Sequence, residues 1–120
     1  MLTSKEKLNQ LNINPNSKLY KYYITYGGFD NNSDEFDEVF DIDELYENNI
    51  ENNYWEDQYP NIREKYLQLS NIEGEGSYFY SLQNNAIYDV SWSEMDKLIN
   101  GELSPRWKTF SEFEKDINRK

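Results

Sequence analysis

Three short runs of residues in the second half of the chain have the pattern of β-strands. From Tyr66 to Ile72 apolar and polar positions alternate, which is the period-two pattern of a half-buried strand. The runs from Ser77 to Leu82 and from Ala86 to Trp92 are rich in aromatic and β-branched residues, which fit a pleated, half-buried surface. Short stretches with glycine or asparagine separate the runs. The pattern therefore predicts a three-stranded antiparallel meander from Tyr66 to Trp92.

The turn between the second and third runs decides how they pair. A three-residue loop with Asn85 in the left-handed conformation would place Tyr80 opposite Tyr88 and Tyr78 opposite Val90. A two-residue turn would instead place an aspartate opposite Tyr80. Since a slip of one residue moves every side chain to the other face, we predict the three-residue loop, which keeps the aromatic side chains together.

Two helices are predicted before the sheet. The first covers Thr3 to Asn12, with Thr3 or Ser4 as its N-cap. The second has Asn14 as its N-cap and Pro15 in its first turn, where proline is tolerated, and Gly27-Gly28 ends it in a left-handed conformation. Apolar residues at helical spacing are expected to face the core. These inward positions are Leu8, Leu11, Leu19, Tyr22, Tyr23 and Tyr26.

Two further helices are predicted after the sheet. The segment from Ser93 to Ile99 has the pattern of one or two helical turns, which Asn100-Gly101 stops. The last helix begins with Thr109 as its N-cap, and Glu112 would complete a capping box in which each side chain accepts a hydrogen bond from the other residue's backbone N–H. Its apolar residues are expected to pack on the sheet: Phe110, Phe113 and Ile117.

The composition bounds the size and chemistry of the protein. With 120 residues, the chain is expected to form a single domain over 1–120 that buries roughly two-thirds of its unfolded-chain surface. Eleven Tyr, six Phe and three Trp supply much of the core. The absence of Cys excludes disulfides, and the absence of His removes the commonest general base and metal ligand. No run approaches the ~20 apolar residues of a membrane helix and no apolar signal segment opens the chain, so we expect a cytoplasmic protein.

The acidic residues are concentrated in one part of the chain. The net charge is −11, which disfavours nucleic acid and anionic membranes as direct partners and favours a basic protein. Between Lys21 and Arg63 there is no basic residue, and this interval contains twelve of the twenty-three acids. They are Asp30, Asp34, Glu35, Asp37, Glu38, Asp41, Asp43, Glu44, Glu47, Glu51, Glu56 and Asp57.

We call residues 30–62 the acidic segment and expect its aromatic residues to anchor it to the core while the carboxylates face water. Its first residues, rich in Asn and Asp, have the composition of an exposed loop. A helix is expected to begin at Asp41 or Asp43. A short strand is indicated by Phe36, Val39 and Phe40, and the helix by Ile42, Leu45, Tyr46 and Ile50. A less regular piece that Pro60 closes contains Tyr54, Trp55 and Tyr59.

The sequence argues against catalysis and metal binding. Asp30-x-Asn32-x-Asp34 resembles the start of an EF-hand loop, but the sixth position is Glu35 and not the glycine that the turn requires. Gly74-x-Gly76 lies between two predicted strands, without a helix N-terminus to bind phosphate. Glu73 and Glu75 flank a glycine turn, where carboxylates are usually solvated. We therefore predict a protein that is not an enzyme and that needs no cofactor or metal.

Three pieces of the chain, in this order, resemble one family. They are the helix that ends in Tyr26-Gly27-Gly28, the Gly-x-Gly before the aromatic hairpin within Tyr66 to Trp92, and the Thr-Phe-Ser-Glu-Phe start of the last helix, within Trp107 to Phe113. The combination resembles the SUKH superfamily, which includes the fungal Smi/Knr cell-wall regulators. The resemblance implies an α+β domain with a curved, mostly antiparallel sheet backed by helices. In bacteria it implies an immunity protein that binds and neutralises a cognate toxin, often a nuclease, without catalytic residues of its own.

Three classes of function fit these features. The first, which we favour, is a toxin-neutralising immunity protein whose acidic surface binds a basic toxin domain, expected to be a nuclease. The second is a regulatory protein-interaction module that has no toxin partner. The third is a nucleic-acid mimic whose carboxylates imitate phosphates and block a DNA-binding protein. A toxin-like domain encoded immediately upstream would select the first class.

The candidate contact residues combine acids with aromatic anchors, since binding energy tends to concentrate in aromatic side chains. We expect a monomer that binds its partner through these residues. They are Asp30, Asp34, Glu35, Asp37, Asp41, Asp43, Glu44 and Glu47, with Tyr46, Tyr54 and Trp55 as anchors.

Overall fold

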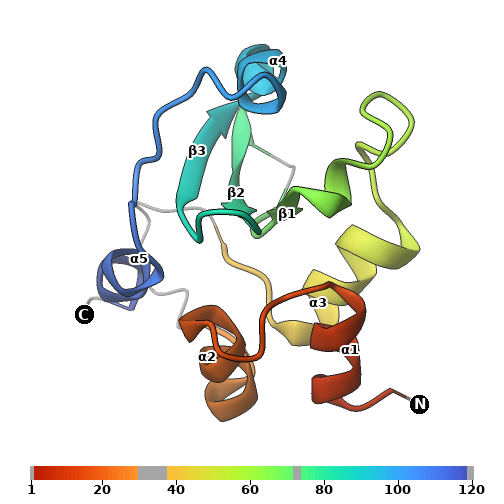
Figure 1. Ribbon diagram of the computed structural model, residues 1–120, viewed down its shortest axis with the longest axis vertical. Helices are drawn as coiled ribbons and strands as arrows, with labels where there is room; N and C mark the ends of the chain where they lie inside the picture. The colour runs from red at the N-terminus through yellow and green to blue at the C-terminus, as the bar shows by residue number, and fades with distance from the viewer. Residues whose placement is uncertain (1, 30–37, 72–73, 119–120) are drawn as a thin grey trace.

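A three-stranded antiparallel sheet with strand order β1-β2-β3 lies at the centre of the molecule (Figure 1). The structure, a computed structural model, describes residues 2–29, 38–71 and 74–118. The strands are β1 (Tyr66–Gln68), β2 (Gly76–Ser81) and β3 (Ile87–Ser91). They fall within the predicted meander and helices flank them, so the predicted α+β class is confirmed.

Helices precede and follow the sheet along the chain. Figure 1 shows three of them, α1, α2 and α3, gathered at one end of the sheet and α4 at the opposite end. The α-helices are α1 (Ser4–Gln10), α2 (Lys18–Tyr26), α3 (Ile42–Tyr46), α4 (Met95–Ile99) and α5 (Phe110–Ile117). Shorter helical pieces are the π-helical η1 (Glu47–Glu51), which continues α3, and the 3-10 turns η2 (Ile62–Glu64) and η3 (Trp92–Glu94).

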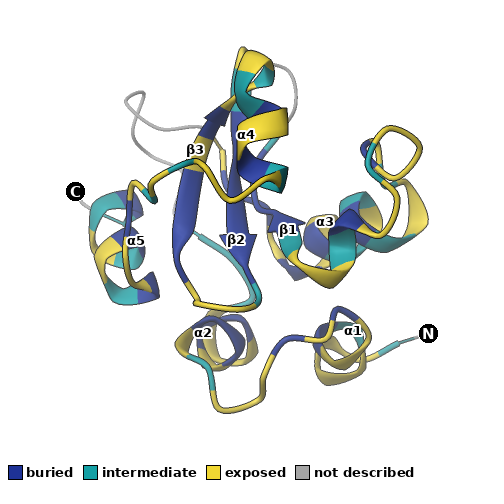
Figure 2. Ribbon diagram, turned by 45° about the horizontal axis from the view of Figure 1, so that its top comes forward, coloured by how far each residue is buried: buried dark blue, intermediate teal, exposed yellow. Residues whose placement is uncertain are grey.

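Two separate groups of buried apolar residues cover the two faces of the sheet. The first core, which includes residues of α1, α2, α3 and α5, takes Tyr78 and Tyr80 from β2. The second core, which includes residues of α4, takes Phe79 from β2 and Tyr88 from β3. Because successive side chains of a strand point to opposite faces, the aromatic run of β2 fills both cores, and Figure 2 shows this strand as buried. The prediction of a half-buried strand is therefore wrong for β2.

The register of the β2–β3 hairpin differs from the prediction by one residue. Tyr88 lies opposite Phe79 and not opposite Tyr80, because the loop has four residues, 82–85. Asn85 is left-handed as predicted, with φ 62°, and its N–H donates to the carbonyl oxygen of Ser81 at 2.9 Å. The Oγ of Ser81 also accepts from two backbone N–H groups of the loop. These bonds stabilise the longer loop.

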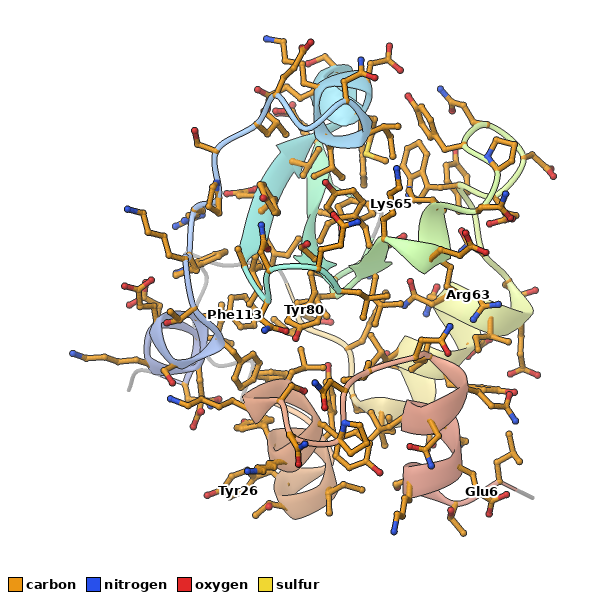
Figure 3. The ribbon with its side chains drawn as sticks, in the orientation of Figure 1. Glu6, Tyr26, Arg63, Lys65, Tyr80 and Phe113 are labelled. Carbon is orange, nitrogen blue, oxygen red and sulfur yellow. The ribbon has the colours of Figure 1, made fainter. Side chains whose placement is uncertain are left out.

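Helix α2 begins three residues later than predicted. Ser17 is its N-cap, and its Oγ accepts from the N–H of Tyr20 at 3.2 Å. Asn14 instead stabilises a turn, with its Oδ1 accepting from the N–H of Asn16 at 2.9 Å. Tyr26, predicted to be buried, is 68% exposed and lies on the outer side of α2 (Figure 3). Tyr20 is buried.

Two other helices follow the prediction closely. In α1, Thr3 is the N-cap, and Leu8 and Leu11 are buried. The helical turns of η3 and α4 end at Asn100, which is followed by Gly101 in a left-handed conformation with φ 74°. These boundaries depend on local signals, which the sequence contains.

Helix α5 confirms the predicted buried side and half of the predicted cap. The Oγ1 of Thr109 accepts from the N–H of Glu112 at 3.2 Å, but Glu112 Oε2 accepts from the N–H of Lys108 and not from that of Thr109. Phe110, Phe113 and Ile117 are buried as predicted, and Figure 3 shows Phe113 pointing from α5 into the molecule.

The glycine pair after α2 places the start of α3. Gly27 is left-handed as predicted, with φ 76°, and its carbonyl oxygen accepts from the N–H of Ile42 at 2.9 Å. A Cβ on Gly28 would lie 2.9 Å from the Cβ of Asp41, so a larger residue would push the two segments apart. The missing side chain of Gly28 therefore lets the start of α3 pack closely against the end of α2.

The short strand predicted before α3 is reduced to one β-bridge, between Val39 and Ser70. The N–H of Phe40 donates to the carbonyl oxygen of Leu69 at 2.7 Å. Phe36 lies outside the described residues. The bridge fixes the chain at the point where it enters α3.

Candidate functional site

Helix α3 anchors the described part of the acidic segment. Asp41 is its N-cap, which confirms one of the two predicted start points. The Oδ1 of Asp41 accepts from the N–H of Glu44 at 2.8 Å, and Glu44 Oε1 accepts from the N–H of Asp41 at 3.1 Å. Ile42 and Leu45 are buried in the first core. Because one side of the short helix is buried, its carboxylates face solvent.

Asn49 connects η1 to the sheet. Its Nδ2 donates to the carbonyl oxygens of Leu45 and Gln68, both at 2.9 Å, and its Oδ1 accepts from the N–H of Gln68 at 2.8 Å. The amide group therefore takes the place of a neighbouring strand beside β1. Glu47 and Glu51, on either side of Asn49 in the sequence, are exposed.

The exposed carboxylates of α3 and η1, with the N-cap, form what we call the acidic face. Lys7 of α1 reaches it and forms an ion pair with Asp43, whose side chain remains 75% exposed. The hydrogen bond to Asp43 raises the pKa of Lys7, and the charge of Glu51 acts in the same direction. Lys7 compensates part of the charge, so the face stays negative. Its members are Asp41, Asp43, Glu44, Glu47 and Glu51.

The structure describes seven of the predicted contact residues and separates them into two groups. Asp41, Asp43, Glu44 and Glu47 belong to the acidic face, and Tyr46 of α3 is half-buried with its hydroxyl donating to Gln10 Oε1 at 2.9 Å. Tyr54 and Trp55 lie beyond η1, and Trp55 packs in the second core. Four predicted residues lie outside the described ranges: Asp30, Asp34, Glu35 and Asp37.

Tyr54 and Trp55 line a pocket of about 310 Å³ together with Gln58 and Trp92, which we call the aromatic pocket. The ring centroids of Tyr54 and Trp55 are 4.8 Å apart with an interplanar angle of 80°, and those of Trp55 and Trp92 are 5.1 Å apart at 42°. The Nε1–H of Trp92 donates to the carbonyl oxygen of Gly74 at 2.8 Å, which fixes its ring.

Sequence reasoning missed three residues of these two surfaces. Glu51 is one of the acids of the segment, and its spacing of four residues from Glu47, next to a predicted helix that includes Ile50, was a signal that could have placed it on the same side. Gln58 lies in a piece without a regular pattern, and Trp92 is distant along the chain and belonged to a predicted strand, so neither was grouped with Tyr54. For the pocket, the signal was the density of aromatic residues in the two stretches.

The titratable groups that the structure shows as strongly shifted are tyrosines with structural roles. Burial raises the pKa of Tyr23 well above 10 and that of Tyr80 to about 12. The hydroxyl of Tyr23 donates to the carbonyl oxygen of Phe40 at 2.9 Å, and that of Tyr80 to Asn85 Oδ1 at 2.6 Å. Both phenols stabilise loops next to the sheet.

Within residues 2–29, 38–71 and 74–118, no three carboxylates are grouped so that they could hold a metal ion. None of the helices in these ranges has the length and apolar character needed to cross a membrane. The carboxylates of the acidic face can contact a partner through charge, and the rings of the aromatic pocket can do so through apolar packing.

Neither the protein-family models, nor the curated proteins, nor the solved structures that were compared with this chain gave a match.

Proposed function

We propose that the protein is a cytoplasmic immunity protein that binds a basic toxin domain, of the nuclease type, through its acidic face. The observation that supports this most strongly is the row of carboxylates held outward by α3 and η1. Asp43, Glu47 and Glu51 follow one another at intervals of four residues and are all exposed. Lys7 already compensates part of the charge of Asp43, and the carboxylates that remain repel one another, so a basic partner that neutralises them relieves this repulsion.

The acidic face is also held in place before any partner binds. The capping box of Asp41 and Glu44 fixes the start of α3, and the amide of Asn49 fixes η1 against β1. A surface that is ordered in advance loses little conformational entropy on binding. A nuclease binds phosphates through basic residues, so carboxylates that contact those residues would exclude the nucleic acid substrate.

Cell growth tests the proposal directly. Where the gene immediately upstream encodes a toxin-like domain, the protein is produced together with that domain. The wild-type protein should restore growth, whereas the double variant Glu47→Lys/Glu51→Lys should not, because it reverses charge in the middle of the acidic face. The matched control is Glu75→Lys/Glu102→Lys, which changes the net charge equally at two exposed positions outside that face and should still protect.

Two outcomes would contradict the proposal. If the acidic-face variant protects as well as the wild type, the contact lies on another surface. If the upstream gene encodes no toxin-like domain, or if the protein does not restore growth in cells that produce that domain, the regulatory or nucleic-acid-mimic class replaces the immunity class. Circular dichroism of each variant shows whether a loss of protection comes from unfolding.

A further inference from the structure

The aromatic pocket lies in an acidic part of the molecule. Tyr54, Trp55 and Gln58 come from the chain between η1 and η2, and Trp92 is the first residue of η3. Residues 52–62 and 91–96, which contribute these side chains, contain no lysine or arginine. They contain four acids, which are Glu56, Asp57, Glu94 and Asp96. None of these acids lines the pocket itself, and Arg63 and Lys97 directly follow the two stretches, so four acids and two bases leave a local net charge of −2, which favours a cationic group.

The ring arrangement favours the same kind of group. The rings of Tyr54, Trp55 and Trp92 meet at angles of 80° and 42°, so they do not form a flat stack that closes the space between them. Faces of aromatic rings attract a cation whose centre lies within about 6 Å of the ring centroid. A volume of about 310 Å³ is at the small end of the range for ligand pockets, which suits one side chain better than a cofactor.

Trp55, which lines this pocket, supplies an independent observation, because its buried indole N–H is unpaired within the described part of the chain. The residue is only 8% exposed, yet its Nε1–H has no acceptor among the described residues. Buried N–H groups in native proteins are nearly always hydrogen-bonded. Tyr54, which packs against Trp55, is 64% exposed, so its ring can move without disturbing the core. A peptide at this position could therefore offer a carbonyl oxygen to Trp55.

We propose that the aromatic pocket receives an arginine side chain of the protein partner, a subsite that rests on the proposed function. The guanidinium group lies against the faces of Tyr54 and Trp92, and a carbonyl oxygen of the same partner segment accepts from Trp55 Nε1–H once the Tyr54 ring has shifted. Arginine fits better than lysine because its planar guanidinium is weakly hydrated and stacks on aromatic rings. The acidic face and the pocket then bind the same basic partner at two places.

The indole N–H signals of the protein test this subsite without any toxin. The probes are four capped tripeptides, acetyl-Gly-Arg-Gly-amide and its citrulline, lysine and glutamate counterparts, titrated into ¹⁵N-labelled protein. The arginine peptide should shift the Trp55 and Trp92 signals saturably. The Trp107 signal should stay constant, since its Nε1–H donates to Asp116 and its ring packs in the first core. Citrulline has nearly the same shape without the charge and should bind about tenfold more weakly. The glutamate peptide should give no saturable shift.

A pair of matched variants locates the binding. Tyr54→Ala removes an exposed ring of the pocket and should weaken arginine-peptide binding about tenfold. Tyr26→Ala removes a tyrosine of similar exposure, 68% against 64%, from α2 and should leave binding unchanged. Unaltered Trp55 signals with the arginine peptide, equal binding of the citrulline or a lysine peptide, or equal effects of the two variants would each overturn the inference.

The failure of this subsite can be told apart from the failure of the proposed function. If the arginine peptide does not bind while Glu47→Lys/Glu51→Lys still abolishes protection, the pocket inference is wrong and the immunity function stands. If the peptide binds as described while the acidic-face variant protects fully, the arginine subsite stands and the acidic face is not the docking surface.

Discussion

At the scale of single residues, Asn49 has the strongest structural role in the acidic segment. Its side-chain amide bonds both the N–H and the carbonyl oxygen of Gln68, and both residues are buried. In the sequence it stands in a polar, acidic run with Asn48 and Asn52, and only its spacing of four residues from Leu45 places it on the buried side of a continued helix. Its partner is 19 residues away along the chain, and such a contact depends on the tertiary structure.

The substitution Asn49→Ala measures this contact. It leaves the N–H and carbonyl groups of Gln68 without these partners in a buried position, so the free energy of unfolding should fall by about 2–3 kcal/mol. Asn52→Ala, at an exposed position, should change it by about 0.5 kcal/mol or less. Urea denaturation measures both, and equal effects would show that the amide of Asn49 does not hold η1 on the sheet.

At the scale of elements, local sequence signals predicted where most helices begin and end. The pairing of strands could not be predicted in the same way. The caps of α1 and α5 and the left-handed glycines depend on residues that are adjacent in sequence, and these were largely correct. The register of β2 and β3 was wrong because apolar residues such as Phe79 and Tyr80 follow one another and both are buried. When both faces of a strand are apolar, the hydrophobic pattern does not select one register.

Helix α5 offers a test at the same scale. Phe113 is fully buried between the helix and the sheet, where its ring contacts Tyr78 and Trp107, so Phe113→Ala should lower the free energy of unfolding by roughly 3–5 kcal/mol. Thr109→Ala removes one cap bond and should cost only about 1 kcal/mol. A neutral Phe113→Ala variant in chemical denaturation would mean that α5 does not dock on the sheet in solution.

At the scale of the whole molecule, the buried tyrosines determine how the fold responds to alkaline pH. Tyrosine in an unfolded chain ionises near pH 10, whereas burial raises the pKa of Tyr80 to about 12 and that of Tyr23 well above 10. Since the folded-state pKa is the higher one, this contribution to stability is complete below pH 10 and is lost as the pH rises towards 12. The raised pKa of Lys7 acts in the same sense.

The urea midpoint should therefore fall steadily above pH 10. Tyrosinate absorbance should be followed on the same samples. It should show that some of the tyrosines ionise only at the higher pH values, together with unfolding. Tyr80→Phe, which cannot ionise, should reduce the dependence of the midpoint on pH. A midpoint that stays constant up to pH 12 would contradict the burial of these phenols.

The charge of the whole molecule leads to the central claim, which is that the acidic face attracts and binds a basic partner. The candidate acids could be predicted from the sequence because they form a block without any base between Lys21 and Arg63. The separation of these acids from Tyr54 and Trp55 could not be predicted, because it depends on the two cores that lie on opposite faces of the sheet. Electrostatic steering over such a face raises the association rate and makes it sensitive to salt.

The association rate constant with the proposed basic toxin domain, measured by stopped flow over a range of salt concentrations, tests this claim most directly. The wild-type protein should associate fast at low salt and slow steeply as salt rises. Glu47→Lys/Glu51→Lys should reduce the low-salt rate constant by about tenfold or more and flatten its salt dependence, whereas Glu75→Lys/Glu102→Lys should have a much smaller effect. Equal rate constants for the wild-type protein and the acidic-face variant at every salt concentration would contradict the account.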